Sequence, residues 1–176
     1  ALQAIDRIRD TAQSHERLFF VEVMGRRTGF LALESGIAGG AEELITPEDP
    51  RNIDELCQHL KESFKWGKRS AIVVVAEGEQ PGDSFRIAQQ VREKTGIESR
   101  VCILGHVQRG GSPTARDRIL ATTLGIYAVQ TLLDGQSGVM VGEVNGQVTY
   151  IPLRETWEKQ KRPNGNLHAL AKLLCT

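Results

Sequence analysis

The sequence predicts an α/β fold of three layers, α/β/α, built on a mainly parallel sheet and followed by a C-terminal extension of a helix and a hairpin. Apolar, β-branched segments alternate with segments whose apolar residues recur every three or four positions, as is typical of strands alternating with helices. The clearest strand, residues 71–76, is apolar throughout, which indicates burial on both faces of a parallel sheet.

The first predicted elements are a helix, a strand and a second helix. Apolar residues at helical spacing predict a helix that begins at Leu2 and ends near Asp10 and Thr11. Residues 18–23 are rich in Phe and Val and predict a strand. Residues 28–38 are small and apolar, and two following glycines close the helix that they predict.

The middle of the chain continues the alternation. A brief strand over 43–46 precedes an amphipathic helix over 51–65, and the strand 71–76 follows. A helix over 84–94 ends at a glycine, and the next strand covers 100–104. These elements together predict a Rossmann-like domain.

The C-terminal part has a different pattern. A long helix is expected over 114–133. Residues 139–144 and 147–151 alternate around Asn145-Gly146, a dipeptide that favours a two-residue hairpin. A final helix is expected over 166–174.

Charge and cysteine content exclude several classes of protein. Lysine plus arginine and aspartate plus glutamate both number 22, so no overall field attracts the chain to nucleic acid or to an anionic membrane. Cys57, Cys102 and Cys175 are widely spaced and form no zinc motif. No apolar run approaches the roughly 20 residues that span a bilayer. We therefore expect a cytoplasmic protein without a structural metal.

Polar residues follow three of the predicted strands, and the carboxyl ends of parallel strands share one edge of a sheet. Arginine can grip a phosphate with two parallel donors, a carboxylate accepts from sugar hydroxyls, and histidine can serve either group. The helix predicted over 28–38, directly after the first of these strand ends, would also offer free backbone N–H groups to an anion. The sequence therefore predicts a sugar-phosphate cradle, formed by Met24, Gly25, Arg26, Glu77, His106 and Arg109.

Each part of this cradle has a simpler interpretation. Arg26 could be a solvated cation in a turn, Glu77 a solvated turn carboxylate, and His106 a half-buried side chain bonded to backbone. The loop at 110–113 lacks the Lys-Ser/Thr ending of a P-loop, and Ser112 could simply cap the next helix.

Other histidines and the tryptophans are given structural roles. His15, His59 and His168 have no partners at ligand spacing and are interpreted as solvated or helix-surface residues. Trp66 and Trp157 are interpreted as packing residues.

Several motifs resemble the C-terminal half of bacterial-type 6-phosphofructokinase, from residue 1 to about residue 163. The motifs are His15-Glu16-Arg17, Val21-Glu22-Val23-Met24-Gly25-Arg26, Ile37-Ala38-Gly39-Gly40-Ala41-Glu42 and Leu104-Gly105-His106-Val107-Gln108-Arg109-Gly110-Gly111-Ser112-Pro113.

The resemblance implies that the cradle binds fructose 6-phosphate for a phosphoryl transfer of glycolysis. It also implies that Arg26 stabilises charge on the phosphoryl group during this transfer. It also implies that Arg17 and Arg100 reach the sugar phosphate of a neighbouring subunit, so that the site is completed in a homotetramer. An allosteric site for a nucleoside diphosphate or phosphoenolpyruvate would involve Arg9, Gly40, Glu42 and Lys68, with Glu42 as ligand of an effector-bound Mg²⁺.

The family's nucleotide loop and catalytic aspartate have no counterpart here, since neither Gly-Gly-Asp nor Thr-Ile-Asp-Asn-Asp occurs. Mg²⁺ with ATP would therefore be bound by an N-terminal half, and the chain alone is expected to be inactive. Whether the donor is ATP or pyrophosphate stays open. Residues 1–112 are expected to form the fructose 6-phosphate domain, and 113–176 to pack on that N-terminal half. The alternative is a non-enzymatic regulatory domain that senses a sugar phosphate or nucleotide.

Overall fold

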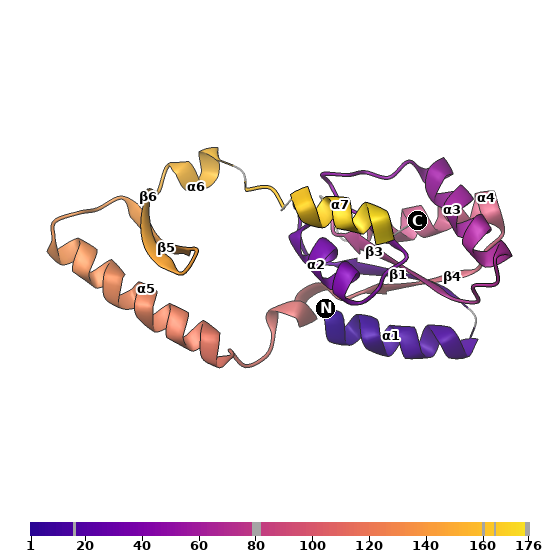
Figure 1. The fold of residues 1–176 in the computed structure, drawn as a ribbon, viewed down its shortest axis with the longest axis horizontal. Coiled ribbons are helices and arrows are strands. Elements are labelled where there is room, and N and C mark those ends of the chain that lie inside the picture. The colour runs from indigo at the N-terminus through magenta and orange to yellow at the C-terminus, as the bar shows by residue number, and fades with distance from the viewer. Residues whose placement is uncertain (16, 79–81, 160, 164, 175–176) are drawn as a thin grey trace. The chain divides into compact units, whose positions relative to one another are not determined.

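The chain divides into two compact units, Ala1–Gly110 with Arg162–Thr176 and Gly111–Lys161 (Figure 1). The computed structural model describes residues 1–15, 17–78, 82–159, 161–163 and 165–174. The first unit contains α1 (Leu2–His15), β1 (Leu18–Val23), α2 (Phe30–Ala38), β2 (Glu43–Ile45), α3 (Ile53–Lys65), β3 (Ala71–Ala76), α4 (Asp83–Thr95), β4 (Ser99–Ile103), the 3-10 helix η1 (Gly105–Arg109) and α7 (Gly165–Leu174).

The four strands of this unit form one parallel sheet in the order β2-β3-β1-β4. The predicted α/β class and parallel sheet are confirmed, and β3 has the predicted bounds. The prediction for the first helix is wrong at its end, because α1 continues past Thr11 to His15.

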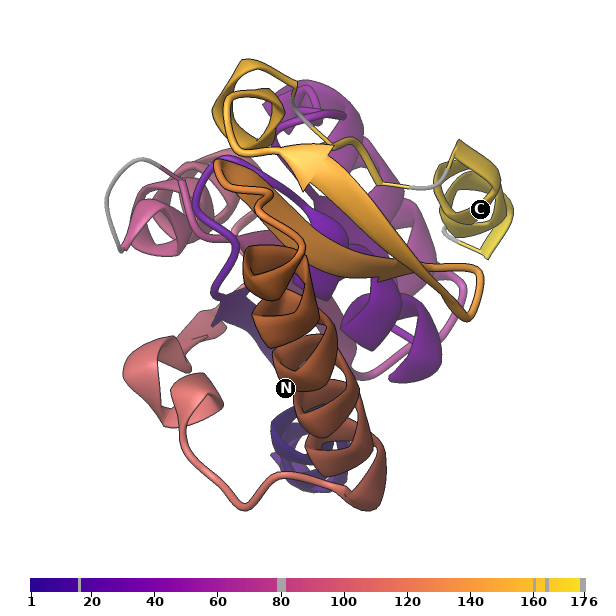
Figure 2. The same ribbon diagram turned by 90° about the vertical axis from the view of Figure 1, so that its left-hand side faces the viewer.

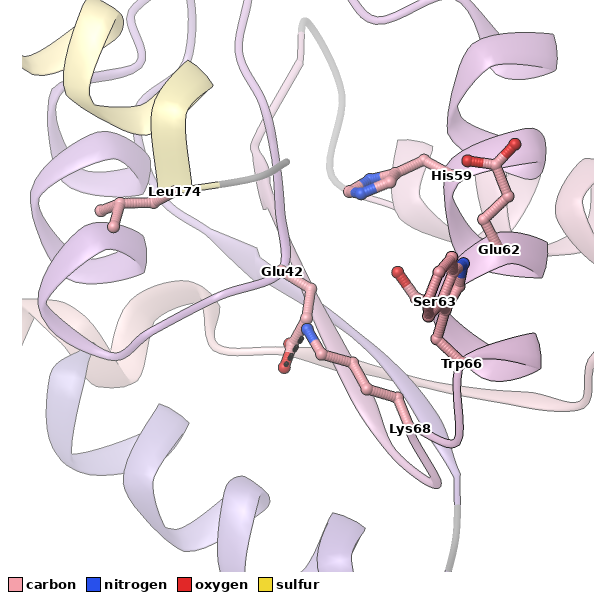
Figure 3. Close-up of a pocket in the computed structure, with 7 residues that line it drawn as sticks. All are labelled: Glu42, His59, Glu62, Ser63, Trp66, Lys68 and Leu174. Atoms are coloured by element: carbon pink, nitrogen blue, oxygen red, sulfur yellow. Dashed lines mark ion pairs between the residues drawn. The ribbon is translucent and has the colours of Figure 1, made fainter.

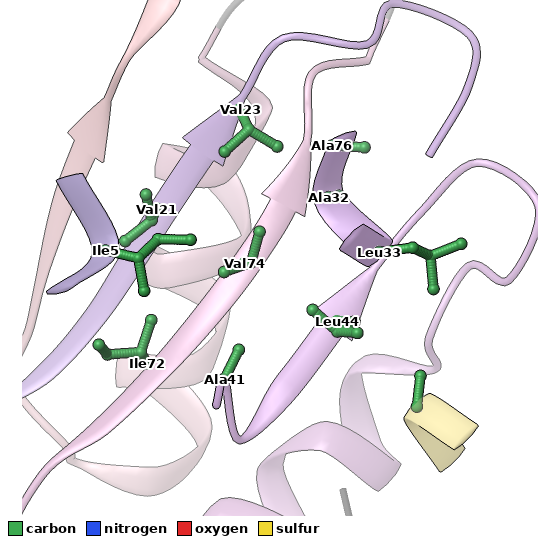
Figure 4. Packing of buried hydrophobic residues seen from close by; sticks show 11 residues of the cluster. Ile5, Val21, Val23, Ala32, Leu33, Ala41, Leu44, Ile72, Val74 and Ala76 are labelled. Carbon is green, nitrogen blue, oxygen red and sulfur yellow. The ribbon is translucent and has the colours of Figure 1, made fainter. Parts of the chain in front are cut away.

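Side chains of β1 alternate between two apolar clusters, one on each face of the sheet. Val21 and Val23 lie in the cluster that includes Ile5 of α1, Leu33 of α2 and Ala171 of α7 (Figure 4). The other cluster joins β1 to α3 and α4 through Leu18, Phe20, Leu56, Cys57, Leu60, Ile87, Ala88 and Val91. The sheet is therefore the middle layer between two layers of helices.

The C-terminal helix α7 belongs to the first unit. Ala171 is only 6% exposed and packs in the cluster formed with α1 and α2. Residues Arg162–Thr176 group with Ala1–Gly110, and the expectation that 113–176 pack on an N-terminal half stays a prediction.

The second unit contains α5 (Ala115–Leu133), β5 (Val139–Val144), β6 (Gln147–Pro152) and α6 (Glu155–Glu158). The two strands pair antiparallel, and Figure 2 shows α5 beside this hairpin. Asn145 and Gly146 both have positive φ, 52° and 75°, as the predicted two-residue turn requires.

Both tryptophans are exposed, Trp66 at 88% and Trp157 at 69%, so their interpretation as packing residues is wrong.

Among the described residues of the second unit, Thr131 alone is buried. The large apolar residues exposed on α5 are Ile119, Ile126, Tyr127, Val129, Leu132 and Leu133. None of the helices within the described ranges is both long enough and apolar enough to cross a bilayer.

Helix α5 is capped by Thr114 and not by Ser112. Thr114 Oγ1 accepts from the Asp117 N–H, and the Asp117 carboxylate accepts from the Thr114 N–H at 2.7 Å. Hydrogen bonds from the Thr114 side chain and backbone lower the pKa of Asp117. Because the pKa of Asp117 is lower in the folded than in the unfolded state, its ionised carboxylate stabilises the start of α5 at pH values above the unfolded-state pKa. This stabilisation is lost as the pH falls through the folded-state pKa.

We expect acidification to speed amide exchange at the start of α5, because protonated Asp117 is a weaker acceptor. The measurement is hydrogen exchange at pH 6 and pH 3, corrected for intrinsic rates. The variant Asp117→Asn should exchange fast at both values. A variant that keeps the wild-type pH dependence would show that another group is responsible.

Candidate functional site

The carboxyl ends of β1, β3 and β4 meet at one edge of the sheet, as predicted. The Glu77 N–H donates to Val23 O at 2.8 Å, which ties the residue after β3 to the end of β1. On the other side of β1, Leu104 N–H donates to Glu22 O at 3.0 Å. The residues that follow the three strands therefore start from neighbouring positions.

The turn after β1 explains why residue 25 is glycine. Gly25 O accepts from both the N–H and the hydroxyl of Thr28, each at 2.9 Å. A Cβ at Gly25 would lie 2.3 Å from Thr28 O, so a side chain cannot be accommodated without a shift of the backbone.

The next residue carries the backbone strain. Arg26 has φ of 51°, in the left-handed region that non-glycine residues rarely adopt. Such a conformation costs on the order of 1–3 kcal/mol and occurs preferentially at functional sites.

The predicted cradle residues lie at or near the surface. Arg26, His106 and Arg109 are exposed, whereas Met24 and Glu77 are half-buried. The interpretation of His106 as half-buried is wrong. Within the described parts of the chain, neither arginine forms an ion pair, so both positive charges are available to an anion.

Internal carboxylates occupy N–H groups at the two helix starts beside this edge. Gly29 N–H, at the start of α2, donates to Glu48 Oε1 at 3.0 Å. At the start of α4, the Glu22 carboxylate accepts from the N–H groups of Gly82 and Ser84. The expectation that α2 begins with freely available N–H groups is therefore wrong at Gly29, and the exposed arginines are the stronger anion binders.

Arg17 and Arg100 do not join the cradle. Arg17 precedes β1, and Arg100 is in register with Phe19 near the start of β1. With a rise of about 3.3 Å per residue, seven residues separate Arg17 from Met24 by roughly 23 Å.

A second group of predicted residues lies at the opposite, amino edge of the sheet. Arg9 donates to Gly39 O and its guanidinium lies 3.6 Å from Glu42. Lys68 Nζ is 3.9 Å from the same carboxylate. Gly40 has φ of 65°, which favours glycine, and it faces the Arg9 side chain. The four residues of the predicted effector set are therefore neighbours.

Glu42 does not offer a free carboxylate to a metal. Its Oε2 accepts from Ile72 N–H at 2.6 Å, and its Oε1 pairs with Arg9 and Lys68. No cluster of three or more His, Cys, Asp or Glu suited to a metal occurs among the residues that the structure describes. The expected Mg²⁺ at Glu42 therefore does not fit the residues around it.

A cavity of about 280 Å³ adjoins this second group (Figure 3). Its lining residues are Glu42, His59, Glu62, Ser63, Trp66, Lys68 and Leu174. His59 lies on α3, as the helix-surface interpretation predicts, and it contacts the buried Glu43 through Nδ1, so it is not fully solvated. His168 Nε2 is buried, whereas the His15 side chain and Cys175 lie outside the described residues.

Two residues close to the cradle are not predicted from the sequence. The Gln108 side chain accepts from the Met24 N–H at 2.8 Å. Glu22 is only 1% exposed, although it is charged. The one signal for Glu22 is a carboxylate inside an apolar strand, and nothing in the sequence pairs Gln108 with a residue 84 positions away.

The fold agrees with comparisons to known proteins. A family model described as phosphofructokinase matches residues 1–132, and the chain belongs to this family. An ATP-dependent 6-phosphofructokinase 1 of Thermus thermophilus is 55% identical over 99% of this chain and 54% of its own length. An ATP-dependent 6-phosphofructokinase of Coxiella burnetii is 54% identical over 87% of this chain and 47% of its own length.

Solved structures agree with this assignment. A phosphofructokinase from Saccharomyces cerevisiae matches 98% of this chain and 23% of its own, with a TM-score of 0.79 and 35% identity. A pyrophosphate-dependent phosphofructokinase from Marinobacter aquaeolei shares the fold, with a TM-score of 0.75 at 21% identity. The chain spans about half the length of the curated relatives that it matches.

Proposed function

We propose that this chain supplies the fructose 6-phosphate site of an ATP-dependent 6-phosphofructokinase, a cytoplasmic enzyme of glycolysis. The observation that carries the proposal is the edge where Arg26, Glu77 and the η1 helix follow adjoining strands, with two arginines that no carboxylate neutralises among the described residues. The ATP-dependent relatives at 54–55% identity support the choice of reaction.

The chemistry of the cradle suits a sugar phosphate. Arg26 and Arg109 would bind the anionic groups, and Arg26 would also stabilise charge on the transferring phosphoryl group. Glu77 would accept hydrogen bonds from sugar hydroxyls, and His106 would bind a hydroxyl or a phosphate oxygen. Met24 and Gly25 would provide the backbone against which the sugar lies.

Assembly would complete the site. Because Arg17 and Arg100 lie far along the strands from the cradle, they would act on the sugar phosphate of a neighbouring subunit in a homotetramer. The exposed apolar residues of α5 support packing of the second unit on an N-terminal portion, which would hold ATP and its Mg²⁺.

The amino-edge group would form a separate effector site. Arg9, Gly40, Glu42 and Lys68 would bind a nucleoside diphosphate or phosphoenolpyruvate. Since Glu42 neutralises both cations, this group is a weaker anion site than the cradle in the isolated chain.

We expect the isolated chain to bind fructose 6-phosphate saturably and to form no fructose 1,6-bisphosphate from it with MgATP, because the catalytic aspartate lies outside this chain. Calorimetric titration measures binding, and a coupled assay measures turnover. Product formation would disprove the predicted inactivity. Absence of binding would contradict the proposed site.

A further inference from the structure

We infer that Glu22 and Gln108 are positioning residues that hold the three strand-end loops in one arrangement. Neither is among the residues proposed to touch the ligand. The inference rests on the proposed function, since it concerns the geometry of the same cradle.

Gln108 joins the first loop to the third. Paired residues of β1 and β3 end at Val23 and Ala76, so the Met24 N–H lies beyond the strand ladder. The Gln108 Oε1 accepts from this N–H at 2.8 Å. Gln108 lies in η1 between His106 and Arg109. Its hydrogen bond to Met24 therefore fixes the position of the turn that carries Arg26 relative to these two residues.

Glu22 joins the first loop to the second. Its carboxylate accepts from Gly82 N–H at 2.8 Å, from Ser84 N–H at 3.1 Å and from the Ser84 hydroxyl. Charge-assisted bonds and the positive end of α4 offset the cost of burying this carboxylate. Glu77 is thus held beside Val23 through its N–H, and Gly82 is held by Glu22 close to where α4 begins.

The two contacts join the end of β1 to different elements, α4 and η1. Glu22 is bonded toward α4, and its backbone oxygen also accepts from Leu104 N–H. Gln108 returns from the β4 side to the Met24 N–H. Without them, the loops would remain attached to the sheet but would sample several relative positions, and the ligand would have to order them on binding.

The experiment compares fructose 6-phosphate binding by wild type, Gln108→Met and Glu22→Gln. Gln108→Met keeps the size of the side chain and removes the acceptor, and we expect the dissociation constant to rise about fivefold to tenfold. Gln89→Met and Glu93→Gln are matched controls on the exposed side of α4, and we expect both to bind as wild type does. Calorimetry provides the dissociation constants.

Amide hydrogen exchange separates positioning from a general loss of stability. We expect faster exchange at Met24 in Gln108→Met and at Gly82 and Ser84 in Glu22→Gln, with the core of β3 unchanged. Wild-type affinity in Gln108→Met would overturn the inference, and so would faster exchange throughout the sheet. If the wild-type chain binds no fructose 6-phosphate, the proposed function fails first, and the inference fails with it.

Discussion

Replacing Arg26 with alanine weakens binding of fructose 6-phosphate by roughly 30- to 150-fold, which corresponds to about 2–3 kcal/mol for lost hydrogen bonds to a charged group. Arg26 is exposed, pairs with no carboxylate among the described residues and is held in a strained conformation at the end of β1. A residue kept there for its fold alone would not need an arginine side chain. Calorimetric titration measures the change.

Two variants control this result. Arg92→Ala removes the same charge from an exposed site on α4, and we expect it to bind nearly as wild type does. Arg26→Lys keeps the charge without the paired donors and should lie between wild type and Arg26→Ala. Equal losses in Arg26→Ala and Arg92→Ala would show that only net charge matters.

Replacing Phe20 with alanine lowers the free energy of unfolding of the first unit by about 3–5 kcal/mol. Phe20 is fully buried on β1, the strand that pairs with both β3 and β4, and packs between the sheet and the layer of α3 and α4. Whole-domain stabilities are about 5–15 kcal/mol, so the variant loses a large part of the total. Denaturation in urea, followed by circular dichroism, measures the loss.

The matched control is Phe85→Ala on α4, where the ring is 58% exposed. Because folding buries less apolar surface of this ring, we expect a much smaller change in the free energy of unfolding for Phe85→Ala than for Phe20→Ala. A similar loss in both variants would mean that the core between β1 and α4 does not dominate the stability of the unit.

Much of the fold follows from local patterns. The apolar run of β3, the alternation of strands and helices and the Asn145-Gly146 turn are each determined by neighbouring residues, and each is found as predicted. The meeting of the three strand ends follows from a general rule of parallel sheets.

Other features depend on contacts between distant residues. The strained φ of Arg26 and the Gln108–Met24 bond arise only when separate loops meet. The position of α7 depends on the packing of Ala171 in the cluster that also contains Ile5 of α1 and Leu33 of α2. The packing role predicted for Trp66 is wrong because this residue follows the last residue of α3 and is 88% exposed.

The most direct test of the proposed site is an NMR titration of the ¹⁵N-labelled chain with fructose 6-phosphate. We predict chemical-shift changes at the amides of Gly25, Arg26 and Glu77 and across residues 105–110, with little change at Glu42 and Lys68. Changes centred on Glu42, Lys68 and Trp66, or no changes at saturating ligand, would contradict the assignment of the sugar-phosphate site to the carboxyl edge of the sheet.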